Sequence, residues 1–471
     1  MLCHAPASPR PHVTRSLRGY GLLIALAALW LGSVVGALWL NNLLAWNCGL
    51  IYISYDTWLI AYVAWKTWDL PRLAEASAPT GARPTLAVIV PARNEARVLP
   101  ATLDALLAQS DLPEQILVVN DGSTDDTAAV LQQRYALPPA AEGLFVSSGN
   151  PRLQVLHKRN SGKADSMNQA VKLLEADVIV TLDADTRLQG DAVARLREAF
   201  QREPQLAAAC GVLTPRCDGG GWARMFEWFQ TFEYLRAFLS RAAWMRSNAL
   251  LLVSGAFAGY RREVLNTLGG YDHESLVEDY ELIHRLHRYA HEHALDWRVR
   301  VIAGARADTE APAGLRAFLH QRRRWFAGFL HTQFAYRRMH GDPRYGAVGT
   351  LMLPVKAADT LQPLFGLTAF ALIGVFIARG AHFVPLVLAV MGGKLLIDFC
   401  YHLWAVGLYH RWLKIPPPRG IWRSAALATL AEPFSFQLAR HTGALWGWII
   451  LITGRQDWAP QRGEPSDWET T

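Results

Sequence analysis

Cysteine is scarce in this sequence, and two common phosphate-binding motifs are missing. The chain of 471 residues has five cysteines, scattered and without a CxxC spacing, which disfavours a disulfide framework and a cysteine-ligated zinc site. No GxGxxG follows the first expected strand and no GxxxxGKS occurs anywhere, which disfavours a dinucleotide-binding fold and a P-loop NTPase. Charged residues make up 18% of the chain. They form no basic face with nucleic-acid motifs, so we expect no nucleic-acid partner.

Apolar residues are abundant, and they concentrate at the two ends of the chain. Two apolar runs occupy residues 20–67, and each approaches the roughly 20 residues that a spanning helix needs. The first run could be a signal peptide, but its apolar core is long and no small-residue cleavage site follows, so we expect two retained spans. A second block, residues 345–454, predicts about three more spans. Its last segment is interrupted by Glu432 and Pro433 and could be re-entrant or interfacial.

Positive charge gives the expected orientation of these spans. Arginines precede the first run within an N-terminal tail of residues 1–19, and Lys66 and Arg72 follow the second run. Further basic residues lie between positions 411 and 423. All of these groups face the cytosol if the large middle region does. The net charge of +7 then suits this topology and contact with anionic lipid.

The middle region, residues 84–338, alternates short apolar runs with amphipathic stretches. We expect buried strands at 85–92, 115–121, 153–158 and 177–185. We expect helices after them at 95–108, 124–134, 163–175 and 191–202. This alternation predicts an α/β domain with βαβ units and a mostly parallel sheet, which binds its ligand at the carboxyl ends of the strands.

Asp183 and Asp185 follow the fourth expected strand. In an extended strand, residues i and i+2 point to the same side, so the two carboxylates would repel unless a cation neutralises them. Mg²⁺ or Mn²⁺, held by one or two carboxylates and substrate phosphates, fits this need. An aspartate-rich turn is the alternative for an isolated DxD. The position after the fourth strand favours a metal site.

Two further residues at this edge are candidates for binding a nucleotide. Lys163 opens an expected helix, where the helix N-terminus and the ammonium group together favour a phosphate. Asp121 can accept hydrogen bonds from a base or a ribose. It can equally well stabilise the turn before Thr124.

The stretch LVEDYELIHRLHRYA offers a candidate base. Glu278 and Asp279 begin its helix, where carboxylates are also favourable as simple helix caps. An aspartate with the ordinary pKa of ~3.9 is a weak base unless burial or a neighbouring charge raises its pKa. His284, His287 and His291 follow on the same helix. We expect them to be surface or lipid-facing side chains and not metal ligands.

Residues 222–245 place charged side chains among apolar ones at helical spacing. This pattern predicts an amphipathic helix in the membrane interface, with a core helix of the domain as the alternative. Under both interpretations the helix takes no part in the chemistry.

Seven motifs occur in one order between residues 84 and 330: VIVPARNEARVL, VVNDGSTDDT, NSGKADSMNQA, TLDADT, VSGAFAGYRREVL, VEDYEL and QRRRW. In this order they resemble the processive, membrane-embedded family 2 glycosyltransferases, which include cellulose, chitin and hyaluronan synthases. Two spans before the domain, about three after it and the tail RQDWAPQRG (within residues 455–471) are most similar to bacterial poly-β-1,6-N-acetyl-D-glucosamine synthases. The resemblance implies a GT-A fold, which is a Rossmann-like nucleotide-sugar domain, in the cytosol and flanked by transmembrane helices.

The resemblance also implies a role for each residue that binds the donor. Uracil and ribose would be held by Pro91, Asn94, Glu95 and Asp121. Lys163 and Asp183 would contact the UDP, and Asp185, with Asp183, would bind the Mg²⁺ or Mn²⁺ cofactor.

The remaining motifs are implied to serve catalysis and the acceptor. Asp279, beside Glu278, would be the general base; Val277 replaces the threonine of the usual T-E-D pattern and removes a possible hydroxyl contact. QxxRW is matched by Gln321, Arg324 and Trp325, with Gln321 and Arg324 at the pyrophosphate and Trp325 against the acceptor sugar. Ser254 and Gly255 would lie under the acceptor. We expect Arg322 and Arg323, the variable positions, to be interfacial charge.

The function implied is an inverting, processive transfer from a UDP-sugar, best guessed as UDP-N-acetylglucosamine, to a β-linked exopolysaccharide. The polymer would leave through the inner membrane of a bacterium, with a small accessory subunit and outer-membrane export proteins as possible partners. Alternatives are a non-processive enzyme that modifies a lipid or glycan, and a synthase using another UDP-sugar. A non-catalytic channel or assembly subunit is disfavoured, because Asp183, Asp185, Asp279 and Arg324 are all present.

The candidate base yields a first test. We expect Asp279→Asn to retain binding of the UDP-sugar and to lose polymer formation, because an amide cannot take a proton from the acceptor hydroxyl. Binding of labelled UDP-sugar and polymer yield are measured on the same membranes. Polymer synthesis by this variant at the wild-type rate would contradict the assignment.

Overall fold

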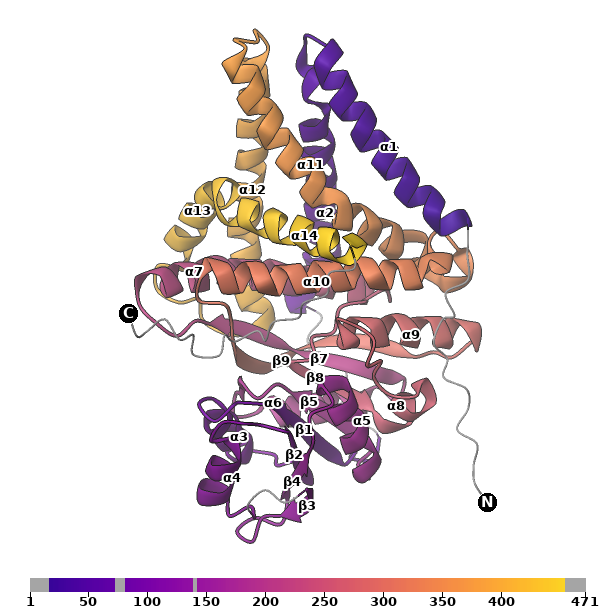
Figure 1. The fold of residues 1–471 in the computed structure, drawn as a ribbon, viewed down its shortest axis with the longest axis vertical. Coiled ribbons are helices and arrows are strands. Elements are labelled where there is room, and N and C mark those ends of the chain that lie inside the picture. Colours follow the sequence, from indigo (N-terminus) through magenta and orange to yellow (C-terminus); the bar gives the residue numbers. More distant parts are fainter. Residues whose placement is uncertain (1–16, 73–80, 139–141, 454–471) are drawn as a thin grey trace.

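The computed structural model describes residues 17–72, 81–138 and 142–453 of the chain. Figure 1 shows three tiers: upright helices at one end, a group of helices lying crosswise beneath them, and an α/β domain at the other end. Residues 1–16 of the N-terminal tail and the motif RQDWAPQRG lie outside the described residues.

The four expected strands and the helices between them are present in the α/β domain. The strands are β1 (Leu86–Ala92), β2 (Gln115–Asp121), β4 (Leu153–Lys158) and β5 (Val178–Leu182). They pair in parallel in the order β4-β2-β1-β5. The helices are α3 (Leu99–Leu107), α4 (Thr127–Tyr135), α5 (Lys163–Leu173) and α6 (Ala192–Arg202). The strands β1, β2 and β5 are buried along almost their whole length. Their sequences are nearly continuously apolar because both faces of each strand are covered.

The sheet as a whole is mixed, so the prediction of a mostly parallel sheet holds for only part of it. Its nine strands run in the order β3-β4-β2-β1-β5-β8-β7-β9-β6. The additional strands are β3 (Gly143–Val146), β6 (Thr186–Leu188), β7 (Leu206–Arg216), β8 (Phe257–Arg261) and β9 (Arg298–Glu310). The strand β8 runs antiparallel to both of its neighbours, β5 and β7, whereas β7 and β9 are parallel. Helices α8 (Arg262–Leu268) and α9 (Glu278–Glu292) connect this half of the sheet.

Further helices lie crosswise between the domain and the upright helices (Figure 1). They are α7 (Gly221–Arg246), α10 (Leu315–Ala335) and α14 (Phe436–Thr453). Two glycines let α14 approach α10 closely. A Cβ at Gly443 would lie 2.8 Å from the Arg322 Cβ, and one at Gly447 would meet the Arg323 carbonyl oxygen. Small residues four positions apart allow helix backbones to touch in this way.

The upright helices are α1 (Leu17–Trp39), α2 (Asn47–Thr67), α11 (Leu353–Ala378) and α12 (Val384–Leu413). Among the described residues, two helical stretches are long and apolar enough to cross a membrane, Val348–Ala378 and Val384–Leu413, and a shorter apolar helix covers Ile24–Trp39. The last apolar segment of the sequence is divided into α13 (Ile421–Ala431) and α14, with the break at Glu432 and Pro433. Helix α14 packs along α10 and also contacts α11 (Figure 1).

The junction of β7, β8 and β9 allows a test of the fold. A Cβ at Gly211, in β7, would lie 2.5 Å from the Ala305 carbonyl oxygen and closer still to the Phe257 ring. We expect Gly211→Ala to lower the free energy of unfolding by about 1–3 kcal/mol, the usual cost of overpacking a core. Gly190→Ala is the matched control, because a Cβ there has no neighbour within 4 Å. Equal thermal unfolding of both variants in detergent would contradict this account.

Candidate active site

A cavity of about 810 Å³ lies where the sheet meets the crosswise helices. It continues from the carboxyl end of β5 to side chains on α2, α11 and α12. Most of the residues expected at the active site line it: Lys163, Asp183, Asp185, Ser254, Gly255, Glu278, Asp279, Gln321, Arg324 and Trp325. The structure therefore brings together motifs that are up to 162 positions apart in the sequence (325 − 163 = 162).

The two aspartates of the DxD motif lie in a turn and not in an extended strand. The strand β5 ends at Leu182, and the Thr186 N–H donates to the Asp183 carbonyl oxygen at 3.0 Å, which closes the turn before β6. The prediction that the two carboxylates follow strand alternation was wrong. They are nevertheless close enough to interact, because the charge of Asp183 contributes to the raised pKa of Asp185.

Asp185 lies in the most acidic part of this site. Burial, followed by the charges of Asp183 and Glu310, raises the pKa of its carboxyl group to about 7. The hydroxyl groups of Thr186 and Thr309 lie 3.4 and 3.5 Å from its Oδ1. This is an environment in which added positive charge would stabilise the ionised carboxylate.

These residues fit a divalent cation of the Mg²⁺ or Mn²⁺ type. The described residues contain no group of three or more histidines, cysteines or carboxylates arranged to enclose a metal ion. Such a cage is not required, since Mg²⁺ commonly uses one or two carboxylates and completes its shell with water and substrate phosphates. Asp185 and Asp183 supply the two carboxylates, and the cost of burying them is what a cation would offset.

Lys163 lies opposite these aspartates, at the first residue of α5. Its Nζ is 2.6 Å from Asp183 Oδ1 and 3.6 Å from Glu278 Oε1. Burial disfavours the charged lysine, but the charges of Asp183 and Glu278 outweigh burial and raise its pKa. The lysine therefore stays protonated and supplies a fixed positive charge between the DxD turn and α9.

Asp279 is held by backbone groups at the start of α9. Its Oδ2 accepts a hydrogen bond of 2.8 Å from the Gly255 N–H, and its Oδ1 accepts one of 2.7 Å from the Tyr280 N–H. A Cβ at Gly255 would lie 3.2 Å from Oδ2, so a glycine permits this close approach. Burial, and then the charge of Glu278, raises the pKa of Asp279. Asp279 thus has the raised pKa that an aspartate needs in order to act as a general base.

The residues expected to hold uracil and ribose lie outside the cavity lining, at the neighbouring strand ends. Asn94 adopts a left-handed conformation (φ 57°), and its Oδ1 accepts from the Thr124 N–H at 2.8 Å. Pro91 is in β1, and the Glu95 N–H donates to the Thr127 hydroxyl at 2.9 Å. These contacts brace the turns that follow β1 and β2.

The side chain of Asp121 organises the loop before α5. It is paired with Lys158 at 2.6 Å and accepts from the Ser161 and Gly162 N–H groups, each at 2.9 Å. It thereby orients the backbone that leads into Lys163. The contact of Asp121 with a base or ribose stays a prediction.

The predicted location was wrong for two of the three arginines in the QRRRW motif. Gln321, Arg324 and Trp325 line the cavity as expected. Arg322 and Arg323 were predicted to be interfacial charge, yet only 4% and 8% of their surfaces are exposed. The reason is the close packing of α14 on α10, which covers this face of the helix.

The histidines of α9 are also not where we expected them. His284 and His287 are buried, and their rings bond to the carbonyl oxygens of Tyr280 and Leu250. Burial lowers the pKa of His284 to about 3 and that of His287 to about 4, so both are neutral. They are core residues of the domain and not surface or lipid-facing groups. His291 is partly exposed.

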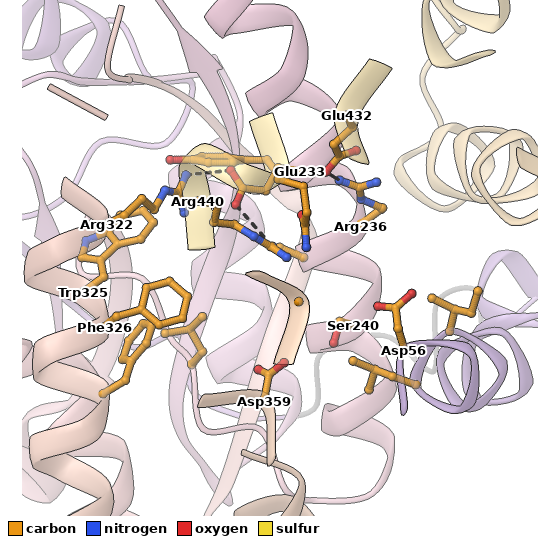
Figure 2. Close-up of a pocket in the computed structure, with 18 of the residues that line it drawn as sticks. Asp56, Glu233, Arg236, Ser240, Arg322, Trp325, Phe326, Asp359, Glu432 and Arg440 are labelled. Atoms are coloured by element: carbon orange, nitrogen blue, oxygen red, sulfur yellow. Dashed lines mark hydrogen bonds and ion pairs between the residues drawn. The ribbon is translucent and has the colours of Figure 1, made fainter. Parts of the chain in front are cut away.

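The helix α7 contributes to the site, which the sequence did not predict. Glu233, Tyr234 and Arg241 line the cavity. Glu233 is 8% exposed and pairs with Arg322 at 2.6 Å (Figure 2). The sequence did contain a sign of this role, since charged residues occur among the apolar residues of this helix. A charge on a buried helix needs a partner.

Lys163 and the carboxylates around it lie at the carboxyl end of the parallel strands, which is where α/β sheets bind their ligands. Residues 87–269 match the family model described as Glycosyl transferase family 2. The fold is similar to that of a mannosyltransferase from Pyrobaculum calidifontis, whose structure contains GDP-mannose and Mn²⁺. The TM-score is 0.53 at 20% identity, over 83% of this chain and 99% of that one. The α/β domain thus has a GT-A fold, and residues 87–269 are similar to family 2 glycosyltransferases.

The curated relatives point to polysaccharide synthesis. The chain is 27% identical over 237 residues to a poly-β-1,6-N-acetyl-D-glucosamine synthase of Staphylococcus aureus (strain COL). It is 26% identical over 236 residues to the enzyme of the same name from Staphylococcus epidermidis. Each match covers 50% of this chain and 52% of the relative, so the chain spans about half the length of the curated relatives that it matches. Over the matched half of the chain, the protein is thus similar to these synthases.

The negative charge of Glu278 beside Asp279 predicts that a mutation of Glu278 will change how activity depends on pH. Glu278→Gln removes a negative charge that raises the pKa of Asp279. The base then stays ionised at lower pH, and we expect the acid limb of the kcat/KM profile to move to lower pH. Glu274→Gln, at an exposed position before α9, is the control and should leave the limb in place. A shift toward higher pH in Glu278→Gln would show that Asp279 is not the titrating base.

Proposed function

We propose that this protein is a processive, inverting glycosyltransferase that polymerises UDP-N-acetylglucosamine into a β-linked exopolysaccharide and passes the polymer through a bacterial inner membrane. The observation that carries the proposal is the continuity of the cavity. One space joins Asp279 and Lys163 to side chains of the upright helices, such as Asp56 on α2 and Lys394 on α12. An enzyme that makes a single transfer needs no such extension.

Asp279 begins the reaction in this proposal. Its carboxylate takes the proton from an acceptor hydroxyl, and the hydroxyl oxygen forms a bond to the anomeric carbon of the donor sugar. The bond from that carbon to the UDP oxygen breaks, and UDP leaves with the electron pair. The hydrogen bonds from Gly255 and Tyr280 orient the carboxylate for this step. Such a base typically contributes about 10²–10⁴-fold to the rate.

Positive charge on the opposite side stabilises the leaving group. Lys163 is held between Asp183 and Glu278, and Arg324 lines the same cavity from α10. When bound, a divalent cation would supply further charge neutralisation for the phosphates, held by Asp185 and Asp183. Trp325, beside Arg324, presents a ring on which a sugar can stack.

Beyond the site, several ionisable side chains line the cavity although the surrounding helices are apolar. Its lining on this side includes Asp56, Asp359, Lys394, Asp398 and Gln437. Lys394 pairs with Asp56 and Asp398, and Lys356 pairs with Asp359 at 2.8 Å. Ionisable groups within apolar helices commonly mark a substrate path, and this lining suits a hydroxyl-rich polymer. Membrane lipids, an accessory subunit and outer-membrane export proteins would be the partners of such a path.

The substrate and product are tested together on membranes that contain the protein. Membranes are incubated with each labelled UDP-sugar in the presence of Mg²⁺ or Mn²⁺, and the product is treated with linkage-specific hydrolases. We expect incorporation from UDP-N-acetylglucosamine into a long polymer that a β-1,6-specific hydrolase degrades, and no incorporation after chelation of the metal. Membranes with Asp279→Asn are the control. Transfer of a single sugar to lipid, with no polymer, would contradict processive synthesis.

A further inference from the structure

Arg322 occupies an unusual position directly beside the residues that match QxxRW. It lies on α10, its side chain is almost fully buried, and its Nη2 is 2.6 Å from Oε2 of Glu233 on α7. Glu233 is equally enclosed. Both residues line the cavity (Figure 2); Arg322 is a variable position of QxxRW, and Glu233 belongs to none of the seven motifs.

The Arg322 guanidinium group lies against two aromatic rings. Its central carbon is 4.6 Å from the centroid of the Phe318 ring and 4.5 Å from that of the Trp325 ring. Phe318 and Trp325 lie one helical turn before and after Arg322, so all three share one face of α10. The cation therefore occupies the space against one face of Trp325 and restricts how that ring can turn.

The helix α14 completes this arrangement. Arg440 Nη1 lies 3.8 Å from the other carboxylate oxygen of Glu233, and Figure 2 shows both arginines converging on that carboxylate. The contact of Gly443 with the Cβ of Arg322 fixes the base of the arginine side chain. Glu233 thus joins cations from two helices, while only one of them lies against Trp325.

Stability alone gives little reason for such a pair. A buried ion pair can often be replaced by apolar residues at no cost in stability, whereas removal of one partner leaves an uncompensated charge. What an ion pair adds is a fixed direction for the planar guanidinium group. Here that direction determines the position of the ring at the cavity.

We propose that Glu233 is a positioning residue for the acceptor: it holds Arg322 against Trp325, so that the ring presents a fixed face to the terminal sugar of the growing chain. The proposal rests on the proposed function, in which Trp325 contacts the acceptor. Neither Glu233 nor Arg322 touches the reacting atoms in this scheme. Their effect is on binding of the acceptor and not on binding of the donor.

The test separates the two substrates of the full-length protein. The KM values for UDP-N-acetylglucosamine and for an added β-1,6-linked N-acetylglucosamine tetramer are measured for wild type and for Glu233→Gln. We expect the KM for the tetramer to rise about tenfold, the size of effect that a buried cation–ring contact can have, and the KM for the donor to stay unchanged. Glu227→Gln, the same change on α7 at a side chain outside the cavity lining, should leave both values at those of wild type.

A second variant covers the case in which Glu233→Gln does not fold. Arg322→Lys keeps the positive charge beside Glu233 but removes the planar group that lies on Trp325. We expect the same selective rise in the KM for the tetramer, with the thermal unfolding midpoint close to that of wild type. An unchanged KM for the tetramer in the folded variants, or an equal rise for donor and tetramer, overturns the proposal.

Failure of the proposed function has a different signature. Wild-type protein would then incorporate no N-acetylglucosamine under any condition. The dissociation constant of the tetramer, compared between wild type and Arg322→Lys, still decides the positioning role in that case. A tenfold weaker binding by the variant supports it, and equal binding overturns it.

Discussion

The concentration of negative charge around Lys163 is the constraint on which the rest of this site depends. Asp183, Glu278 and Asp279 all act on the pKa of this one lysine, and Asp185 lies among them with its own pKa raised. An arrangement with so many carboxylates is costly without cations. The domain therefore holds an excess of acidic groups that are suited to receive positive charge with the substrate.

This constraint explains why backbone groups are so prominent at the site. The hydrogen bonds from Gly255 and Tyr280 fix the Asp279 carboxylate without adding another charge. Asp121 uses the Ser161 and Gly162 N–H groups to set the loop that carries Lys163. Neutral donors thus provide geometry, and the few cations at the site supply charge compensation. A base with a raised pKa and a permanently protonated lysine can coexist in one cavity for this reason.

The sequence predicted those parts of the structure that depend on local pattern. The strands β1, β2, β4 and β5 are buried in a parallel arrangement, and near-continuous apolar runs are typical of that environment. The residues at their carboxyl ends converge because chain direction is the same in each strand. The antiparallel insertion of β8 between β5 and β7 was not predictable in this way, since strand order depends on contacts between segments about 80 positions apart (257 − 178 = 79).

The errors at the site have a common physical origin. Arg322, Arg323, His284 and His287 were assigned to surfaces because of their polarity, and each is buried by a partner that is distant in the sequence or by its own backbone. The partner of Arg322 is Glu233, 89 positions earlier. The cover over Arg323 comes from Trp446, whose ring centroid is 4.7 Å from the guanidinium group. Polarity in a single sequence predicts exposure only when no such partner is available.

The pairing of Lys394 with Asp56 has a consequence for biosynthesis. The two residues are 338 positions apart, on α12 and α2. The GT-A domain lies between them in the chain, so the ribosome completes this domain before it makes the helix that carries Lys394. Until then Asp56 lacks this cation, and the cavity lacks the wall that α12 provides. A nascent chain can therefore hold a finished α/β domain while the cavity is still open on one side. Under the proposed function, the transfer site would be complete before the path for the polymer.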